Sequence, residues 1–202
     1  MIATSKTTAK SSTQVKTVRG DVLTIHRDKT WEQFKHLQQG FENSHGVRLF
    51  YFGGTVEILM PGKAHELFKS VIGFLIEAFL FHREIEFEPT GSMTQEKTEV
   101  ASVEADESYE IEGLKLSVEV NFTSGDVGKL KRYQALAVDE VWIWEDGVLR
   151  AYHLQSDGYK QVSRSSIPAL SVIDLDLFSN CIIVGETSRI QAAKTLLAAY
   201  PN

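Results

Sequence analysis

Residues 103–121 read VEADESYEIEGLKLSVEVN, and this stretch decides the fold prediction. From 114 to 121, apolar and polar residues alternate strictly, which predicts a strand with one face in the core and one polar face. An antiparallel turn at 112–113 would bring Asp106 beside Glu119 on the neighbouring strand. The alternation fixes the direction of the Glu119 side chain, so the two carboxylates are expected to lie side by side.

Two adjacent carboxylates repel each other unless a cation separates them. Residues 84–112 hold ten carboxylates against one base, Lys97. So many carboxylates in a short segment are typical of solvated strand faces and loops. The alternative interpretation is that one or two of these carboxylates bind a hard cation. Mg²⁺ prefers oxygen ligands and takes only one or two carboxylates. A divalent ion at Asp106 and Glu119, with the ammonium of Lys129 nearby, is coherent with phosphodiester hydrolysis, because the ion orients water and stabilises charge at phosphorus.

The flanking sequence alternates between strand and helix patterns. Apolar periodicity and turn residues predict strands at 22–26, 48–52, 55–59, 139–145 and 148–154, a short strand after 158, and helices at 31–41, 64–82, 130–136 and 186–200. Gly53-Gly54 is a hairpin signal. This order predicts an α/β (mixed α+β) fold with a central mixed β-sheet flanked by helices.

Composition describes an ordinary globular chain of 202 residues, 43% hydrophobic and 24% charged. Residues 1–20 are rich in Ser, Thr and Lys and predict a disordered basic tail, which leaves 21–202 as a single domain with a C-terminal helix. The net charge is −6 and the tail contributes +4, which leaves −10 for 21–202. The strong negative charge of residues 21–202 argues against nonspecific binding along nucleic acid. It does not argue against a nuclease, because bound divalent cations can reverse the charge of a local surface patch.

The sequence argues against several cellular locations and several kinds of functional site. The single cysteine, Cys181, excludes a disulfide scaffold, and the six histidines are too scattered for a zinc cluster. The longest apolar run, 71–81, is too short to cross a bilayer, and no leader opens the chain, so the expected location is cytoplasmic, with no membrane partner. Residues 123–130 fail as a phosphate-binding loop, because Thr123 and Leu130 stand where Gly and Ser or Thr are needed.

From about residue 30 to 175, the chain resembles the PD-(D/E)XK (restriction-endonuclease-like) nuclease superfamily, and more specifically the Uma-type endonuclease family. The resemblance rests on the order and spacing of several motifs. These are GTVEILMP at 54–61 followed by His65, EPTG at 88–91, DESY at 106–109, VEV at 118–120, Lys129 four residues before Tyr133, and EVWIWEDG at 140–147.

By that resemblance, Asp106, Glu119 and Lys129 are the catalytic residues. Asp106, Glu119 and the backbone carbonyl of Val120 would bind Mg²⁺ or Mn²⁺, the substrate would be DNA, and the protein would be a homodimer. Ala105 replaces the usual proline of the motif, and Asn121 occupies its lysine position, so Lys129 on the following helix would take the role of that lysine.

Two further functions stay open at this point. The fold could serve as a catalytically inactive binding or assembly module, as Asn121 in the lysine position suggests. Alternatively, the protein could be a metal-dependent phosphohydrolase of small nucleotides.

Other residues have competing interpretations. Glu57 is either an exposed glutamate or an additional acid at the metal site. His65 either bonds locally at the start of its helix or acts near the site, and Asn121 is a further candidate. Lys129 could instead pair with Asp126. Trp142 and Trp144 share one strand face and are expected in the core or a dimer contact rather than stacked on bases. Lys131 and Arg132 favour a solvated helix face over phosphate contacts.

Overall fold

The structure, a computed structural model, describes residues 13–122 and 128–201, which form two six-stranded sheets and five α-helices. Sheet 1 has the strand order β1 (Thr13–Val18), β2 (Asp21–His26), β4 (Thr55–Met60), β3 (Arg48–Phe52), β7 (Ala101–Glu104) and β6 (Thr94–Lys97). Sheet 2 has the order β12 (Gly158–Val162), β11 (Val148–Gln155), β10 (Glu140–Glu145), β9 (Leu114–Val120), β8 (Glu107–Ile111) and β5 (Phe87–Pro89). The helices are α1 (Trp31–Gly40), α2 (Lys63–His82), α3 (Gly128–Ala135), α4 (Leu175–Gly185) and α5 (Arg189–Ala198), with a short 3₁₀ helix at Pro168–Leu170.

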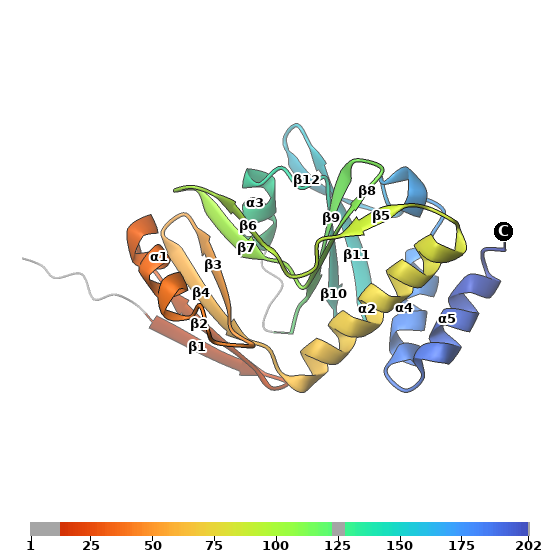
Figure 1. The fold of residues 1–202 in the computed structure, drawn as a ribbon, viewed down its shortest axis with the longest axis horizontal. Coiled ribbons are helices and arrows are strands. Elements are labelled where there is room, and N and C mark those ends of the chain that lie inside the picture. The colour runs from red at the N-terminus through yellow and green to blue at the C-terminus, as the bar shows by residue number, and fades with distance from the viewer. Residues whose placement is uncertain (1–12, 123–127, 202) are drawn as a thin grey trace, which may run out of the picture.

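The mixed α/β class is confirmed, but the prediction of one central sheet is wrong, because the strands divide between two sheets (Figure 1). In sheet 1 every strand pair is antiparallel, whereas sheet 2 is mixed because β9 and β10 are parallel. The connection between these parallel strands contains α3, as a parallel pair requires a crossover. That crossover brings α3 between the two sheets, next to the polar face of β9.

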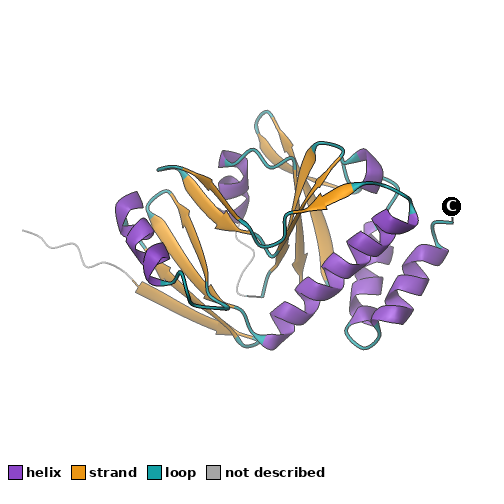
Figure 2. Cartoon of the chain, viewed as in Figure 1, coloured by secondary structure: helices purple, strands orange, loops and turns teal. Residues whose placement is uncertain are grey.

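The layers of the fold arise because side chains alternate between the two faces of each strand. Helix α1 packs its buried Phe34 against the outer face of sheet 1. The inner face of sheet 1 meets the inner face of sheet 2 and α3 in a second core that includes Phe50, Leu59 and Tyr133. Helices α2, α4 and α5 cover the other face of sheet 2 (Figure 2).

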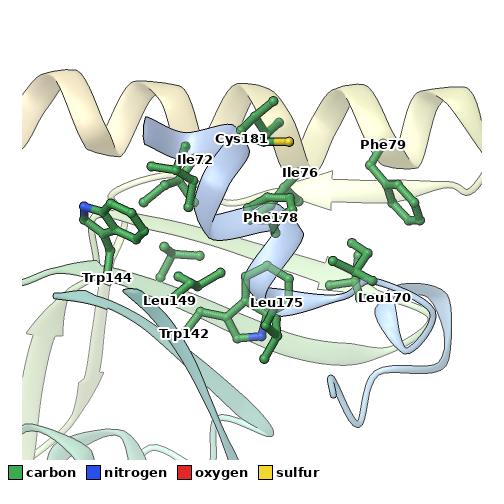
Figure 3. Packing of buried hydrophobic residues seen from close by; sticks show 14 of the residues in the cluster. Ile72, Ile76, Phe79, Trp142, Trp144, Leu149, Leu170, Leu175, Phe178 and Cys181 are labelled. Atoms are coloured by element: carbon green, nitrogen blue, oxygen red, sulfur yellow. The ribbon is translucent and has the colours of Figure 1, made fainter. Parts of the chain in front are cut away.

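The largest core lies between sheet 2 and these three helices. Trp142 and Trp144 on β10 are 0% and 1% exposed and pack against α2 and α4, together with residues such as Ile76 and Phe178 (Figure 3). Their predicted place in the core is therefore confirmed. Burial of such large apolar side chains stabilises the packing of these layers by about 25 cal/mol per Å² of apolar area removed from water.

The predicted tail is wrong for residues 13–20. β1 pairs with β2 along its whole length, from Thr13 opposite His26 to Val18 opposite Asp21, with a turn at Arg19-Gly20. The prediction failed because few large apolar residues mark β1, which gains its stability from backbone pairing with β2. Residues 1–12 lie outside the described residues.

Other element predictions agree with the structure. The hairpin of β3 and β4, the long helix α2 and the strands β9 to β12 are confirmed. Thr30 closes a capping box with Gln33 at the start of α1. The C-terminal helix is confirmed as α5, but α4, which precedes it, was not predicted. In the part of the chain that the structure describes, no helix has the length and apolar character needed to cross a membrane.

Gly62 fixes where the β1–β2 turn meets the start of α2. A Cβ atom there would lie 2.6 Å from the backbone carbon of Gly20. We expect Gly62→Ala to lower the free energy of unfolding by about 1–3 kcal/mol, as overpacking does. Gly40→Ala is the matched control, because a Cβ atom at Gly40 meets nothing within 4 Å. Urea unfolding of both variants measures the difference, and equal stability of both would contradict the close packing.

Candidate active site

Asp106 and Glu119 face each other across the β8–β9 ladder. Glu107 pairs with Val118, and the Asp106 N–H donates to the Val118 carbonyl at 3.1 Å, so the ladder continues one residue beyond β8. Asp106 therefore lies opposite Glu119. Both side chains are on the face of sheet 2 that looks toward sheet 1, and their residues are 0% and 3% exposed. The structure thus brings together the two carboxylates that the sequence pairs.

Asp106 is held by groups from three separate elements. Its Oδ1 accepts from His65 Nε2 at 2.7 Å and forms an ion pair with Arg48 on β3. Its Oδ2 accepts from the backbone N–H of Val120 at 2.6 Å. Because Arg48 is itself only 5% exposed, this ion pair is shielded from solvent. The negative charge of Asp106 is balanced inside the protein.

His65 links two carboxylates and is the second buried element of the site. Its Nδ1 lies 2.8 Å from Asp21 Oδ2, and Asp21 Oδ1 accepts from the Gly62 N–H at 2.7 Å. Carboxylates only accept hydrogen bonds, so a ring nitrogen of His65 that carries a proton donates to the carboxylate it faces. The interpretation of His65 as a residue that bonds locally is wrong, since its partners are far away in the chain.

Glu119 has different partners, both on α3. The Tyr133 hydroxyl donates to Glu119 Oε1, and Lys129 Nζ lies 3.6 Å from Glu119 Oε2. Burial, and then the charge and hydrogen bond of Glu119, raise the pKa of Tyr133 well above its ordinary value. Tyr133 therefore stays a neutral donor. Lys129 reaches the carboxylate site from the helix, while its alternative partner Asp126 lies outside the described residues.

The remaining predicted residues surround this pair. Asn121 is 1% exposed and its Nδ2 donates to Glu145 Oε1 at 2.8 Å. Glu57 is not an exposed glutamate: its side chain is 15% exposed and pairs with Arg132 at 2.5 Å. Lys131 is exposed, as expected of a solvated helix face.

The prediction that Arg132 lies on a solvated helix face is wrong. Arg132 is buried and lies over the Phe50 ring, with its guanidinium carbon 5.4 Å from the ring centroid.

Sequence reasoning missed Asp21 and Arg48, saw Arg132 only as a surface candidate, and used Tyr133 only as part of the motif that contains Lys129. Asp21 was the first residue of the predicted domain, directly before the predicted strand at 22–26, so its buried bond to His65 had no visible signal. Arg48 does carry a signal in the sequence. It lies two residues before Phe50 on the same strand, so both side chains lie on the same face, the inner face of sheet 1. A charged residue on a core-facing position predicts a buried partner of opposite charge.

The oxygen atoms of Asp106 and Glu119 are of the kind that a hard divalent cation prefers. The described residues contain no cluster of three or more His, Cys, Asp or Glu side chains that could hold a metal ion. Magnesium, however, commonly uses only one or two carboxylates with water in its other positions. Asn121, two residues after Glu119 in the chain, has a buried Oδ1 with no hydrogen-bond partner among the described residues. Oxygen donors without thiolate or neutral imidazole favour Mg²⁺ or Mn²⁺ over zinc.

Comparison with known proteins gives no relative for this chain: no protein-family model and no curated protein sequence matches it.

Proposed function

We propose that this protein is a metal-dependent DNA endonuclease that hydrolyses phosphodiester bonds, built on the restriction-endonuclease-like fold of the Uma-type family and acting in the cytoplasm. One observation carries the proposal: two buried carboxylates from adjacent strands lie opposite each other, with Lys129 Nζ 3.6 Å from one of them. The homodimer is implied by the family resemblance alone.

Each side chain has a defined role in this proposal. Asp106 and Glu119 would hold Mg²⁺ or Mn²⁺, with the Val120 carbonyl as a third ligand and Asn121 Oδ1 as a further oxygen nearby. When bound, the ion supplies Lewis-acid stabilisation of charge on the phosphoryl oxygens. Lys129 places its ammonium beside Glu119, where it orients the attacking water or stabilises the transition state.

The partners of the carboxylates preserve their orientation. Arg48 and His65 fix Asp106, and Tyr133 fixes Glu119, so each carboxylate is held in one orientation. Such preorganised charge is worth more in a buried site than in water. The same buried contacts keep the alternative function open. The chain's own cations neutralise Asp106 without a metal, as an inactive binding or assembly module would require.

A cleavage assay with variants of α3 tests the proposal. Purified protein is incubated with supercoiled plasmid in Mg²⁺, Mn²⁺ or EDTA, and we expect nicked and linear products only with metal. Lys129→Met is expected to slow cleavage by about 10²-fold or more, as loss of one electrostatic stabiliser does. Lys131→Met is the matched control, because Lys131 is exposed on the same helix.

Mn²⁺ calorimetry on the wild type and Lys129→Met separates the two functions. Under the nuclease proposal both proteins bind Mn²⁺, because Lys129 is not a ligand. A wild type that neither binds Mn²⁺ nor cleaves DNA would favour the binding module and overturn the nuclease.

A further inference from the structure

A basic cavity lies beside the candidate active site, between the β1–β2–β4 part of sheet 1 and the start of α3. Its volume is about 230 Å³. Four basic residues line it: Lys16, Arg27, Lys129 and Arg132. Among the described lining residues the only acid is Glu57, which pairs with Arg132. This set is called the basic cavity below.

The charge of the basic cavity is opposite to that of the chain. Its lining carries a net +3, whereas the whole chain carries −6. A concave surface of one sign concentrates ligands of the opposite sign, and the acidic remainder of the surface repels them. A polyanion is therefore directed to this cavity rather than spread over the molecule. Lys and Arg side chains are the groups that contact nucleic-acid phosphates.

The framework that holds Lys16 and Arg27 is ordered. Lys16 lies opposite Leu23 in the β1–β2 ladder, on the sheet face that lines the cavity, and Arg27 directly follows β2. Buried Asp21 fastens the turn of this hairpin to the start of α2 through the Gly62 N–H and His65. The hairpin is thus tied to the same histidine that holds Asp106.

Lys129 connects the basic cavity to the carboxylates. It lines the cavity and its Nζ lies 3.6 Å from Glu119 Oε2. Lys129 therefore belongs both to the lining of the basic cavity and to the surroundings of Glu119. Figure 1 shows α3 between the strands of sheet 1 and the strands β9 and β10 of sheet 2.

We propose that the basic cavity binds the phosphodiester backbone of duplex DNA, with Lys16 and Arg27 contacting phosphates beside the one that is cleaved. The cleaved position rests on the proposed function, but the backbone contact does not require cleavage. Phosphate contacts give affinity and register without sequence information, so these residues are expected to position DNA rather than to select a base sequence.

The test measures DNA binding without cleavage. Fluorescence anisotropy of a labelled duplex is recorded in EDTA over a range of salt concentrations for the wild type and for Lys16→Ala/Arg27→Ala. Each phosphate contact contributes about 0.9 to the slope of log K against log salt. We expect the double variant to bind at least about tenfold more weakly at low salt, with a slope shallower by about 1.8.

Arg189→Ala/Lys194→Ala is the matched control. It removes the same two charges from exposed positions on α5, outside the basic cavity. Affinity unchanged by Lys16→Ala/Arg27→Ala, or an equal loss in both double variants, would overturn the inference, and so would a wild type that does not bind the duplex. If the wild type binds through Lys16 and Arg27 but never cleaves plasmid with Mg²⁺ or Mn²⁺, the nuclease proposal fails and the backbone contact stands.

Discussion

Asp106→Asn is expected to remove DNA cleavage and Mn²⁺ binding and to lower the free energy of unfolding by about 3–5 kcal/mol. The loss of cleavage follows from its role as a proposed ligand, since a neutral amide does not replace a carboxylate at a hard cation. The loss of stability follows from its partners. Arg48 is 5% exposed and His65 is 1% exposed, so both would face an uncharged amide in a buried position, and each would keep only its other acidic partner, Glu66 for Arg48 and Asp21 for His65.

A second substitution separates these two effects. Arg48→Met in the Asp106→Asn background removes the guanidinium, whose remaining ion pair is with the exposed carboxylate of Glu66 at 2.8 Å. Replacement of a buried ion pair by uncharged side chains is often nearly neutral. We expect the double variant to recover most of the lost stability in urea unfolding and none of the cleavage. Asp157→Asn, which removes a fully exposed carboxylate on the turn before β12, is the control for loss of one charge. Cleavage by a folded Asp106→Asn protein at the wild-type rate would contradict the proposed site.

The sequence could predict the carboxylate pair because its geometry is local. Asp106 and Glu119 belong to consecutive strands joined by a tight turn, and period-two alternation gives the direction of both side chains. The prediction that Lys129 lies near Glu119 came only from a family resemblance. The sequence does not define the length or the angle of the connection between β9 and α3. The structure brings Lys129 to Glu119 because the parallel pairing of β9 and β10 requires the crossover that holds α3.

The partners of Asp106 could not be predicted, for a physical reason. Arg48 and His65 approach it from β3 and the start of α2, and Asp21 reaches His65 from β2. These contacts depend on how sheet 1 packs against sheet 2, which alternation within one strand does not define. The N-terminal hairpin was missed for a related reason: β1 is a mostly exposed edge strand, so no apolar pattern separates it from a disordered segment.

Glu119→Gln is expected to lower cleavage to the level seen in EDTA while the protein stays folded. The substitution keeps the size of the side chain, and the Tyr133 hydroxyl can still donate to the amide oxygen. The contact with Lys129, at 3.6 Å, is lost. Loss of one such polar interaction costs about 1 kcal/mol of stability. The expected pattern is therefore the reverse of that at Asp106: a large loss of function with a small loss of stability.

This contrast is informative because the hydrogen-bond partner of Glu119 is the neutral Tyr133 hydroxyl, with the Lys129 ammonium farther away at 3.6 Å, whereas Asp106 contacts the Arg48 guanidinium directly. Tyr133, whose pKa is raised by burial and by Glu119 itself, needs no counter-charge when the carboxylate becomes an amide. The matched control is Glu110→Gln, an exposed glutamate on neighbouring β8. Calorimetry should show Mn²⁺ binding by the wild type and by Glu110→Gln but not by Glu119→Gln. Mn²⁺ affinity and cleavage within a few-fold of wild type in Glu119→Gln would mean that this carboxylate orients α3 rather than holding a cation.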